Sequence, residues 1–168
     1  MNDALLRTGL GGTASTVLFV ASAFGQIDAS NDTCATAYGP VSDGFHFIDT
    51  TGATDSGVAP TGLPPYVDTS TPNTQCEDFG GSIDHMNLDV WFEFVPDFDG
   101  TYWLHCCTNS SFNTKVAIYS GTCGSLGALA CNDDCNLASS SLVIVDGLLA
   151  GNTYMVQVGS PLVAATGT

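Results

Sequence analysis

The chain has 168 residues, of which 44% are hydrophobic and 11% charged, and its formal net charge is −15. This composition excludes a disordered tail and is sufficient for the core of one domain. Only two residues are basic, Arg7 and Lys115, against seventeen acids, fifteen of which are Asp. Such a balance excludes nucleic acid and anionic membrane as partners. It favours a solvated acidic surface with an affinity for cations.

The first 25 residues have the pattern of a secretory signal peptide. Arg7 precedes a short apolar stretch from Leu10 to Phe24. Both Ala21-Ser22-Ala23 and Ala23-Phe24-Gly25 fit the small-x-small rule for cleavage, so the mature chain is expected to begin at Phe24 or Gln26. We therefore expect residues 1–25 to be removed and residues 26–168 to form a single β-sandwich domain. The mature chain then keeps one basic residue against sixteen acids, a net charge of 1 − 16 = −15. No second apolar stretch is long enough to insert into a membrane.

Cysteine content agrees with export to an oxidising compartment. The chain has seven cysteines, at positions 34, 76, 106, 107, 123, 131 and 135. The odd number leaves one thiol unpaired, and about 105 arrangements of three bridges are possible, so sequence alone leaves the pairing open. A metal cluster is the alternative, but the spacings lack the paired Cys-x2-Cys of a structural zinc site.

The rest of the chain is predicted to be all-β, because no window has a helical period and short alternating runs are separated by turn residues. The expected strands are 45–48, 89–95, 101–107, 115–120, 126–130, 140–145 and 153–158. Their spacing predicts an antiparallel β-sandwich, jelly-roll-like and stapled by disulfides.

Turn residues suggest how these strands connect. Pro96 to Gly100 predicts a hairpin between the second and third strands, and turn residues after Val145 predict another between the last two. The stretch 53–80 is rich in Pro, Gly, Ser and Thr and is expected to be a long loop. After Gly159 no closing strand follows, which predicts an exposed edge and a C-terminally truncated fragment missing its last strand.

Several motifs together resemble a known family. They are Asn31-Asp32-Thr33-Cys34, Phe47-Ile48-Asp49-Thr50-Thr51-Gly52, Asp89-Val90-Trp91-Phe92, Gly100-Thr101-Tyr102, Phe112-Asn113-Thr114, Ala117-Ile118-Tyr119-Ser120-Gly121, Cys131-Asn132-Asp133-Asp134 and Thr153-Tyr154 with Val156 and Val158. In this order they resemble the secreted β-sandwich repeats of planctomycete-type bacteria, which are similar to the bacterial pre-peptidase C-terminal (PPC-like) domains. The match covers residues 31–159.

This resemblance implies a non-catalytic sandwich attached to larger exported proteins, with calcium bound in some members. It also implies the pairs Cys34–Cys76, Cys107–Cys135 and Cys123–Cys131, with Cys106 as the spare thiol. One departure concerns the ion: where the family has Phe-Asp-Thr, this chain has Asn113 in place of the carboxylate.

An oxygen-rich turn is the strongest candidate for chemistry. Asn132, Asp133 and Asp134 lie between two cysteines, and a Cys107–Cys135 bridge would bring Asn113 and Thr114 close to them. Calcium takes six to eight oxygen ligands from such residues. The turn is therefore a predicted calcium site, and an Asx-rich turn without an ion is the alternative.

Other chemistry has weaker support. The histidines at 46, 85 and 105 are isolated, and no Gly-x-Ser-x-Gly elbow occurs. Trp91 and Trp103 lie opposite the most apolar strand face and could stack on sugars, although filling the core is the commoner role.

We therefore expect a calcium-supported, non-catalytic module of a bacterial secreted or cell-surface protein, with a spacing, adhesion or targeting role. Its expected partners are adjacent domains of the same polypeptide, an extracellular polysaccharide or a surface protein. One alternative is a carbohydrate-binding module that uses Trp91 or Trp103. The other is a cryptic secreted hydrolase, because the acids include many pairs of Asp residues that could form a glycosidase dyad.

Overall fold

A computed structural model describes residues 14–18, 26–61, 86–106, 110–133 and 140–161, the first of these ranges by its backbone alone. These residues form strands and two short 3-10 turns, η1 (Ala29–Asn31) and η2 (Cys34–Thr36). The strands are β1 (Ala14–Leu18), β2 (Tyr38–Val41), β3 (Asn87–Phe94), β4 (Gly100–His105), β5 (Lys115–Thr122), β6 (Ser125–Asn132), β7 (Leu142–Leu148) and β8 (Tyr154–Ser160). The predicted all-β class is therefore confirmed.

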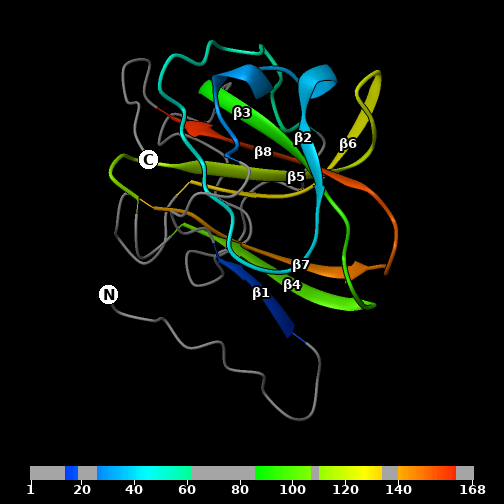
Figure 1. Cartoon of the computed structure of the whole chain (residues 1–168). Coiled ribbons are helices and arrows are strands. Elements are labelled where there is room, and N and C mark those ends of the chain that lie inside the picture. Colours follow the sequence, from blue (N-terminus) through cyan, green and yellow to red (C-terminus); the bar gives the residue numbers. More distant parts are fainter. Residues whose placement is uncertain (1–13, 19–25, 62–85, 107–109, 134–139, 162–168) are drawn as a thin grey trace.

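The strands make two sheets, which Figure 1 shows as two layers. The larger sheet has five strands in the order β2-β3-β8-β5-β6, and the smaller has three in the order β1-β4-β7. Most neighbours are antiparallel, but β2 runs parallel to β3 and β1 runs parallel to β4. The chain is thus a β-sandwich with two parallel pairs, each at one edge of a sheet.

The main core fills the space between the sheets. Alternate residues of β3, β5 and β8 face the alternate residues of β4 and β7, as expected when one face of each strand is apolar. The side chains that share this core include Val90, Phe92, Phe94, Tyr102, Leu104, Val116, Ile118, Val143, Val145, Val156 and Val158. The alternation of Val90, Phe92 and Phe94 that predicted a strand thus marks the inward face of β3.

A second apolar cluster covers the outer face of the five-stranded sheet. Its buried members are Met86, Trp91, Ala117, Tyr119, Cys131 and Met155, with Cys34, Ala37 and Val58 packed against them. Trp91 stacks on Tyr119 with ring centroids 5.5 Å apart. The larger sheet is therefore buried on both faces, which an alternating sequence does not predict.

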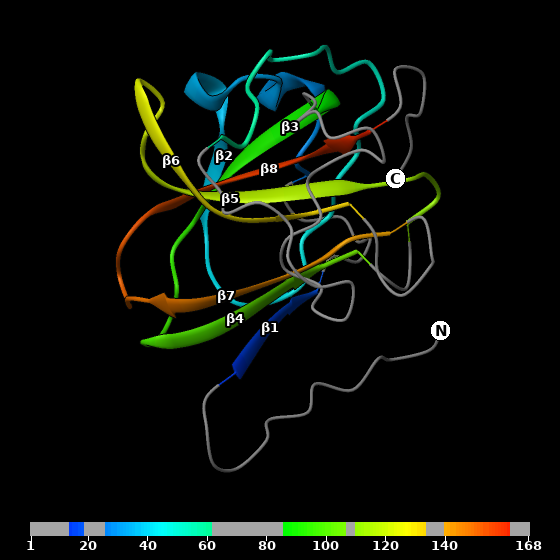
Figure 2. The ribbon, with the colours of Figure 1, turned by 180° about the vertical axis from the view of Figure 1, so that it is seen from behind.

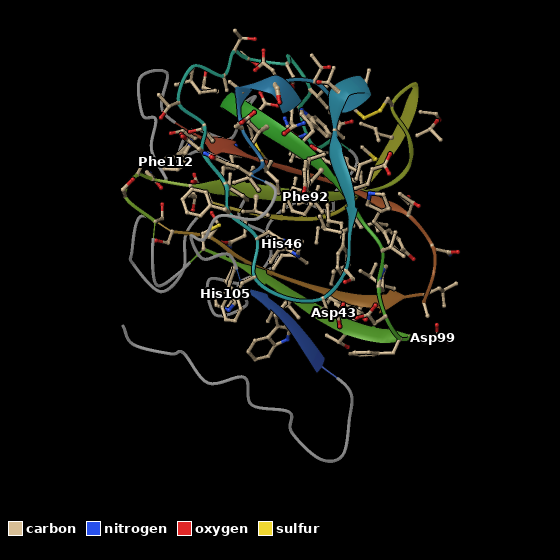
Figure 3. All side chains as sticks on the ribbon, in the orientation of Figure 1. Asp43, His46, Phe92, Asp99, His105 and Phe112 are labelled. Carbon is tan, nitrogen blue, oxygen red and sulfur yellow. A yellow bond between two sulfur atoms is a disulfide. The ribbon has the colours of Figure 1, made fainter. Side chains whose placement is uncertain are left out.

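The two predicted hairpins are wrong. β3 pairs with β8, whereas β4 pairs with β7 in the other sheet. In both places the chain crosses from one sheet to the other. The two connections are hydrogen-bonded to each other: Gly151 donates its N–H to the Pro96 carbonyl at 3.0 Å, and Ala150 donates its N–H to Asp99 Oδ1 at 2.8 Å. Asp99 lies at the end of the sandwich where these crossings meet (Figure 3). Turn residues mark where a strand ends but not which sheet the chain enters next.

Three smaller expectations also need correction. The predicted strand 45–48 makes a single bridge, between Ile48 and Ile27, in place of a ladder. Strand β2 was missed because Pro40, which the structure places at a sheet edge after a cis peptide bond, is typical of turns. Strand β8 lies between β3 and β5, so it does not form the exposed edge that its position near the end of the chain predicted.

A disulfide joins η2 to the β5–β6 turn through Cys34 and Cys123, with Cα atoms 5.5 Å apart. The implied pairs Cys34–Cys76 and Cys123–Cys131 are therefore wrong. Cys131 is disulfide-bonded but lies near the far end of β6 from Cys123. The strand from Ser125 to Cys131, extended at about 3.3 Å per residue, separates these two cysteines too widely for a bridge.

The implied Cys107–Cys135 pair lies outside the described residues, as do Cys76, Asp134 and His85. Within the described part of the chain, no helix is long and apolar enough to cross a membrane.

Candidate functional site

The predicted oxygen-rich site lies at one corner of the sandwich, where β6 ends and β5 and β7 begin. Ser141 joins the three segments: its Oγ lies 2.5 Å from the carbonyl oxygen of Thr114 and 3.1 Å from that of Asp133. Four of the five predicted residues, Asn113, Thr114, Asn132 and Asp133, thus come from segments that meet here, and the fifth, Asp134, is not described. Sequence reasoning missed Ser141 because it reads as the start of a strand.

Two of these side chains are already engaged by the protein. Thr114 Oγ1 accepts the N–H of Ser141 at 2.9 Å, and Asn132 Oδ1 accepts the N–H of Leu142 at 2.9 Å. Both side chains are buried, with 2% and 0% of their surface exposed. Each oxygen satisfies a backbone donor where β7 starts, so these two residues act in the corner as structural acceptors.

Asn113 and Asp133 remain as candidate ligands. Asn113 Oδ1 is buried and accepts no hydrogen bond from the described residues, which is costly for an amide oxygen. Asp133, in the acidic turn at the same corner, is about nine-tenths buried. Amide and carboxylate oxygens suit a hard cation such as calcium. The corner thus fits a smaller ligand set than the sequence predicted.

The described residues contain no group of three or more His, Cys, Asp or Glu side chains placed to hold a metal ion. The Nε2 of His46 lies 2.8 Å from the carbonyl oxygen of Ser42 in its own loop. His105 belongs to β4 (Figure 3), and burial lowers the pKa of its imidazole.

The two tryptophans differ in exposure. Trp91 does lie opposite the inward face of β3, as predicted, but it is fully buried beneath the chain's own residues and cannot stack on a sugar. Trp103 is 39% exposed on the outer face of the smaller sheet, where it pairs across strands with Ile144. Of the two predicted sugar platforms, only Trp103 can meet a ligand.

A buried polar network on the outer face of the larger sheet was not predicted. Asp89 Oδ2 accepts the indole N–H of Trp91 at 2.7 Å and the amide of Gln157 at 2.9 Å, and its Oδ1 accepts the N–H of Ser56 at 2.8 Å. Tyr119 donates its hydroxyl to Gln157 Oε1 at 2.5 Å. Burial raises the pKa of the Asp89 carboxyl, and burial also raises the pKa of Tyr119.

This network fixes a covering segment to the sheet. Ser56 and Val58 lie in the segment above β3 and β8, and Gln157 also donates to the carbonyl oxygen of Val58 at 3.3 Å. Gly159 lies beside Asp89, where an added Cβ would come within 2.9 Å of the aspartate Cβ. The polar side chains here bind the protein's own backbone.

Lys115 lies on the same face as the network, paired with Gly159 across strands and fully buried. It is the sole basic residue of the chain after position 25. The described residues from 26 onward therefore expose no lysine or arginine side chain.

Cys106 is a free cysteine, as predicted, and burial raises the pKa of its thiol to about 12. A thiol with this pKa forms almost no thiolate at pH 8, and only the thiolate is nucleophilic. We expect a thiol reagent to leave Cys106 unmodified in the native protein and to modify it rapidly in 6 M guanidinium. Stoichiometric labelling of the native protein at Cys106 would contradict this assignment. Peptide mapping of the labelled protein measures the extent of modification at Cys106.

No family model matches the chain, and no match is found among curated proteins or solved structures.

Proposed function

We propose that residues 26–168 form a non-catalytic module of a bacterial secreted or cell-surface protein, with a spacing, adhesion or targeting role. The observation that supports this most is the use of the polar side chains. Asp89, Gln157, Thr114 and Asn132 all hydrogen-bond the domain's own backbone or buried side chains. Side chains used in this way stabilise a scaffold and are not available to a substrate.

Export is supported by the cysteines and the charge. A disulfide such as Cys34–Cys123 persists in oxidising compartments and is rare in the cytosol. A surface without basic side chains disfavours nucleic acid and anionic lipid, and leaves neutral polymers and other proteins as partners. The resemblance to planctomycete-type and PPC-like repeats belongs to this proposal, and neighbouring domains of one polypeptide would then be the first partners.

Calcium binding at the corner between β5, β6 and β7 is part of the proposal. Asn113 and Asp133 would contribute side-chain oxygens, with Asp134 next in the chain, while Thr114 and Asn132 would keep their structural hydrogen bonds. A bound cation would satisfy the buried oxygen of Asn113 and fix the three segments together. Its effect would be on stability.

A thermal unfolding experiment tests this site. We expect calcium at a hundredfold excess over its Kd to stabilise the mature domain by about 2.7 kcal/mol relative to excess chelator, since it binds only the folded state. Asp133→Ala should abolish the shift, and Asn113→Asp should enlarge it by adding a carboxylate. Asp97→Ala, on an exposed turn, is the matched control. If neither the natural domain nor Asn113→Asp responds, the corner is an Asx turn without an ion.

Carbohydrate binding is a second candidate, favoured by the exposure of Trp103. An exposed indole can stack on a sugar ring, and Thr101 and Asp146 hydrogen-bond each other at 2.6 Å nearby on the same strands. We expect neutral polysaccharides to change the fluorescence of Trp103, and Trp103→Ala to bind at least tenfold more weakly. Unchanged binding by Trp103→Ala would exclude this platform.

A further inference from the structure

Strand β1 lies along β4 at the outer edge of the smaller sheet. Five consecutive residue pairs, from Ala14 with Thr101 to Leu18 with His105, run parallel and without a register shift. Figure 2 shows β1 as the outermost strand of this sheet, beside β4. The backbone groups of β4 that do not face β7 are thus directed to β1, as the order β1-β4-β7 requires.

Strand β1 lies within the predicted signal peptide, residues 1–25. Cleavage would remove this strand and leave the smaller sheet with β4 and β7. The edge of β4 would then present a row of unpaired N–H and C=O groups, which is a template for another strand. The inference therefore rests on the proposed export of the domain.

The β4 edge lacks the features that usually protect an edge. Strand β4 (Gly100–His105) contains no proline, lysine, arginine or acid, and its pairing with β1 has no bulge. The register of β4 does shift in its pairing with β7, between Gly100 and Tyr102 at the start of the strand. The edge strand β2 of the larger sheet differs, because it contains Gly39 and Pro40 and its register shifts. Proteins that do not use an open edge normally block it.

We infer that the mature domain binds an extended segment of a partner polypeptide at the β4 edge, as an added parallel strand. The segment seated there, Ala-Ser-Thr-Val-Leu, indicates the chemistry: uncharged, with small and β-branched residues. An acidic segment is disfavoured by the net charge of −15. Main-chain hydrogen bonds to residues 101–105 supply the affinity, and the side chains on the Trp103 face supply the specificity.

The experiment uses the exported mature protein and a synthetic peptide of residues 12–19. Its leader cleavage and disulfides are first verified by mass spectrometry, so that failure of the export proposal is seen separately. We then measure amide hydrogen exchange in β4 with and without the peptide. The expected result is at least tenfold slower exchange of those amides in residues 101–105 that do not face β7, with residues of β5 unchanged. A peptide of the same composition in scrambled order, and one with Thr16→Pro, are the controls.

Three outcomes would overturn the inference in a cleaved and folded sample. One is unchanged exchange in β4 at millimolar peptide. A second is equal protection by the scrambled and proline peptides, which indicates nonspecific association. The third is protection that rises with protein concentration in the absence of peptide, which indicates that a second copy of the domain occupies the edge.

Discussion

Replacing Asp89 with alanine is expected to lower the free energy of unfolding of the mature domain by about 3–5 kcal/mol. Asp89 is fully buried, and its carboxylate accepts hydrogen bonds from Trp91, Gln157 and the backbone of Ser56. The substitution leaves these buried donors without their acceptor. Urea unfolding followed by circular dichroism measures the change.

Asp89→Asn tests the same hydrogen-bond network with a side chain of nearly the same shape. The asparagine NH2 group must face either the donors from Trp91 and Gln157 or the donor from Ser56, so we expect destabilisation despite the loss of a buried charge. The exposed Asp97→Ala is the control and should change stability by less than about 0.5 kcal/mol. A loss below 1 kcal/mol in Asp89→Ala would contradict the role given to the network.

The pH dependence of stability gives a separate test of Asp89. Burial raises the pKa of this carboxyl in the folded protein above its ordinary value of 3.8. The folded state then binds the proton more tightly than the unfolded state does, so protonation adds to the stability that Asp89 contributes, and this added part is fully present below pH 3.8. The added part is lost as the pH rises through the folded-state pKa, while the hydrogen bonds that the carboxylate accepts remain. The loss of stability in Asp89→Ala should therefore be larger below pH 3.8 than above the folded-state pKa of Asp89.

Removing the Cys34–Cys123 bridge is expected to have a comparable effect. The bridge closes a sequence separation of 89 residues, and loss of such a crosslink costs about 2–4 kcal/mol through the freedom gained by the unfolded chain. The variant is Cys34→Ser with Cys123→Ser, unfolded in urea without reductant. Cys106→Ala, which leaves every bridge intact, is the control. An unchanged unfolding midpoint in the double variant would contradict the pairing.

Alternating residues predicted the strands well but not their partners. Val90, Phe92 and Phe94 identified β3 because a strand with one buried face repeats every two residues. The same pattern does not record which sheet follows a turn, so the connections after β3 and after β7, which cross between sheets, were predicted as hairpins. The two crossings lie together at one end, held by hydrogen bonds between Gly151 and Pro96 and between Ala150 and Asp99.

The outer face of the larger sheet could not be predicted because irregular chain covers it. Asp89, Trp91 and Glu93 alternate with apolar residues, which is typical of a solvent-facing strand side. The segment containing Ser56 and Val58 lies over this face, and a non-repetitive segment has no period by which to recognise it. The buried position of Trp91 and the polar network around Asp89 both follow from that cover.

The candidate site was predicted in part. Sequence identified the acidic turn and the segments that meet it, and the structure places Asn113, Thr114, Asn132 and Asp133 at one corner of the sandwich. Sequence could not show that Thr114 and Asn132 already accept backbone hydrogen bonds from Ser141 and Leu142. Those contacts depend on where β7 starts.

Intact mass of the exported protein tests the central proposal most directly. The full chain is expressed in a bacterium with an oxidising periplasm, and the mature protein is recovered from the exported fraction and weighed without reductant. We expect the mass of a chain that begins at residue 24 or 26, less six hydrogens for three disulfides. One thiol, Cys106, should react only after unfolding. A retained leader, or a folded protein with seven reactive thiols, would contradict an exported module stabilised by disulfides.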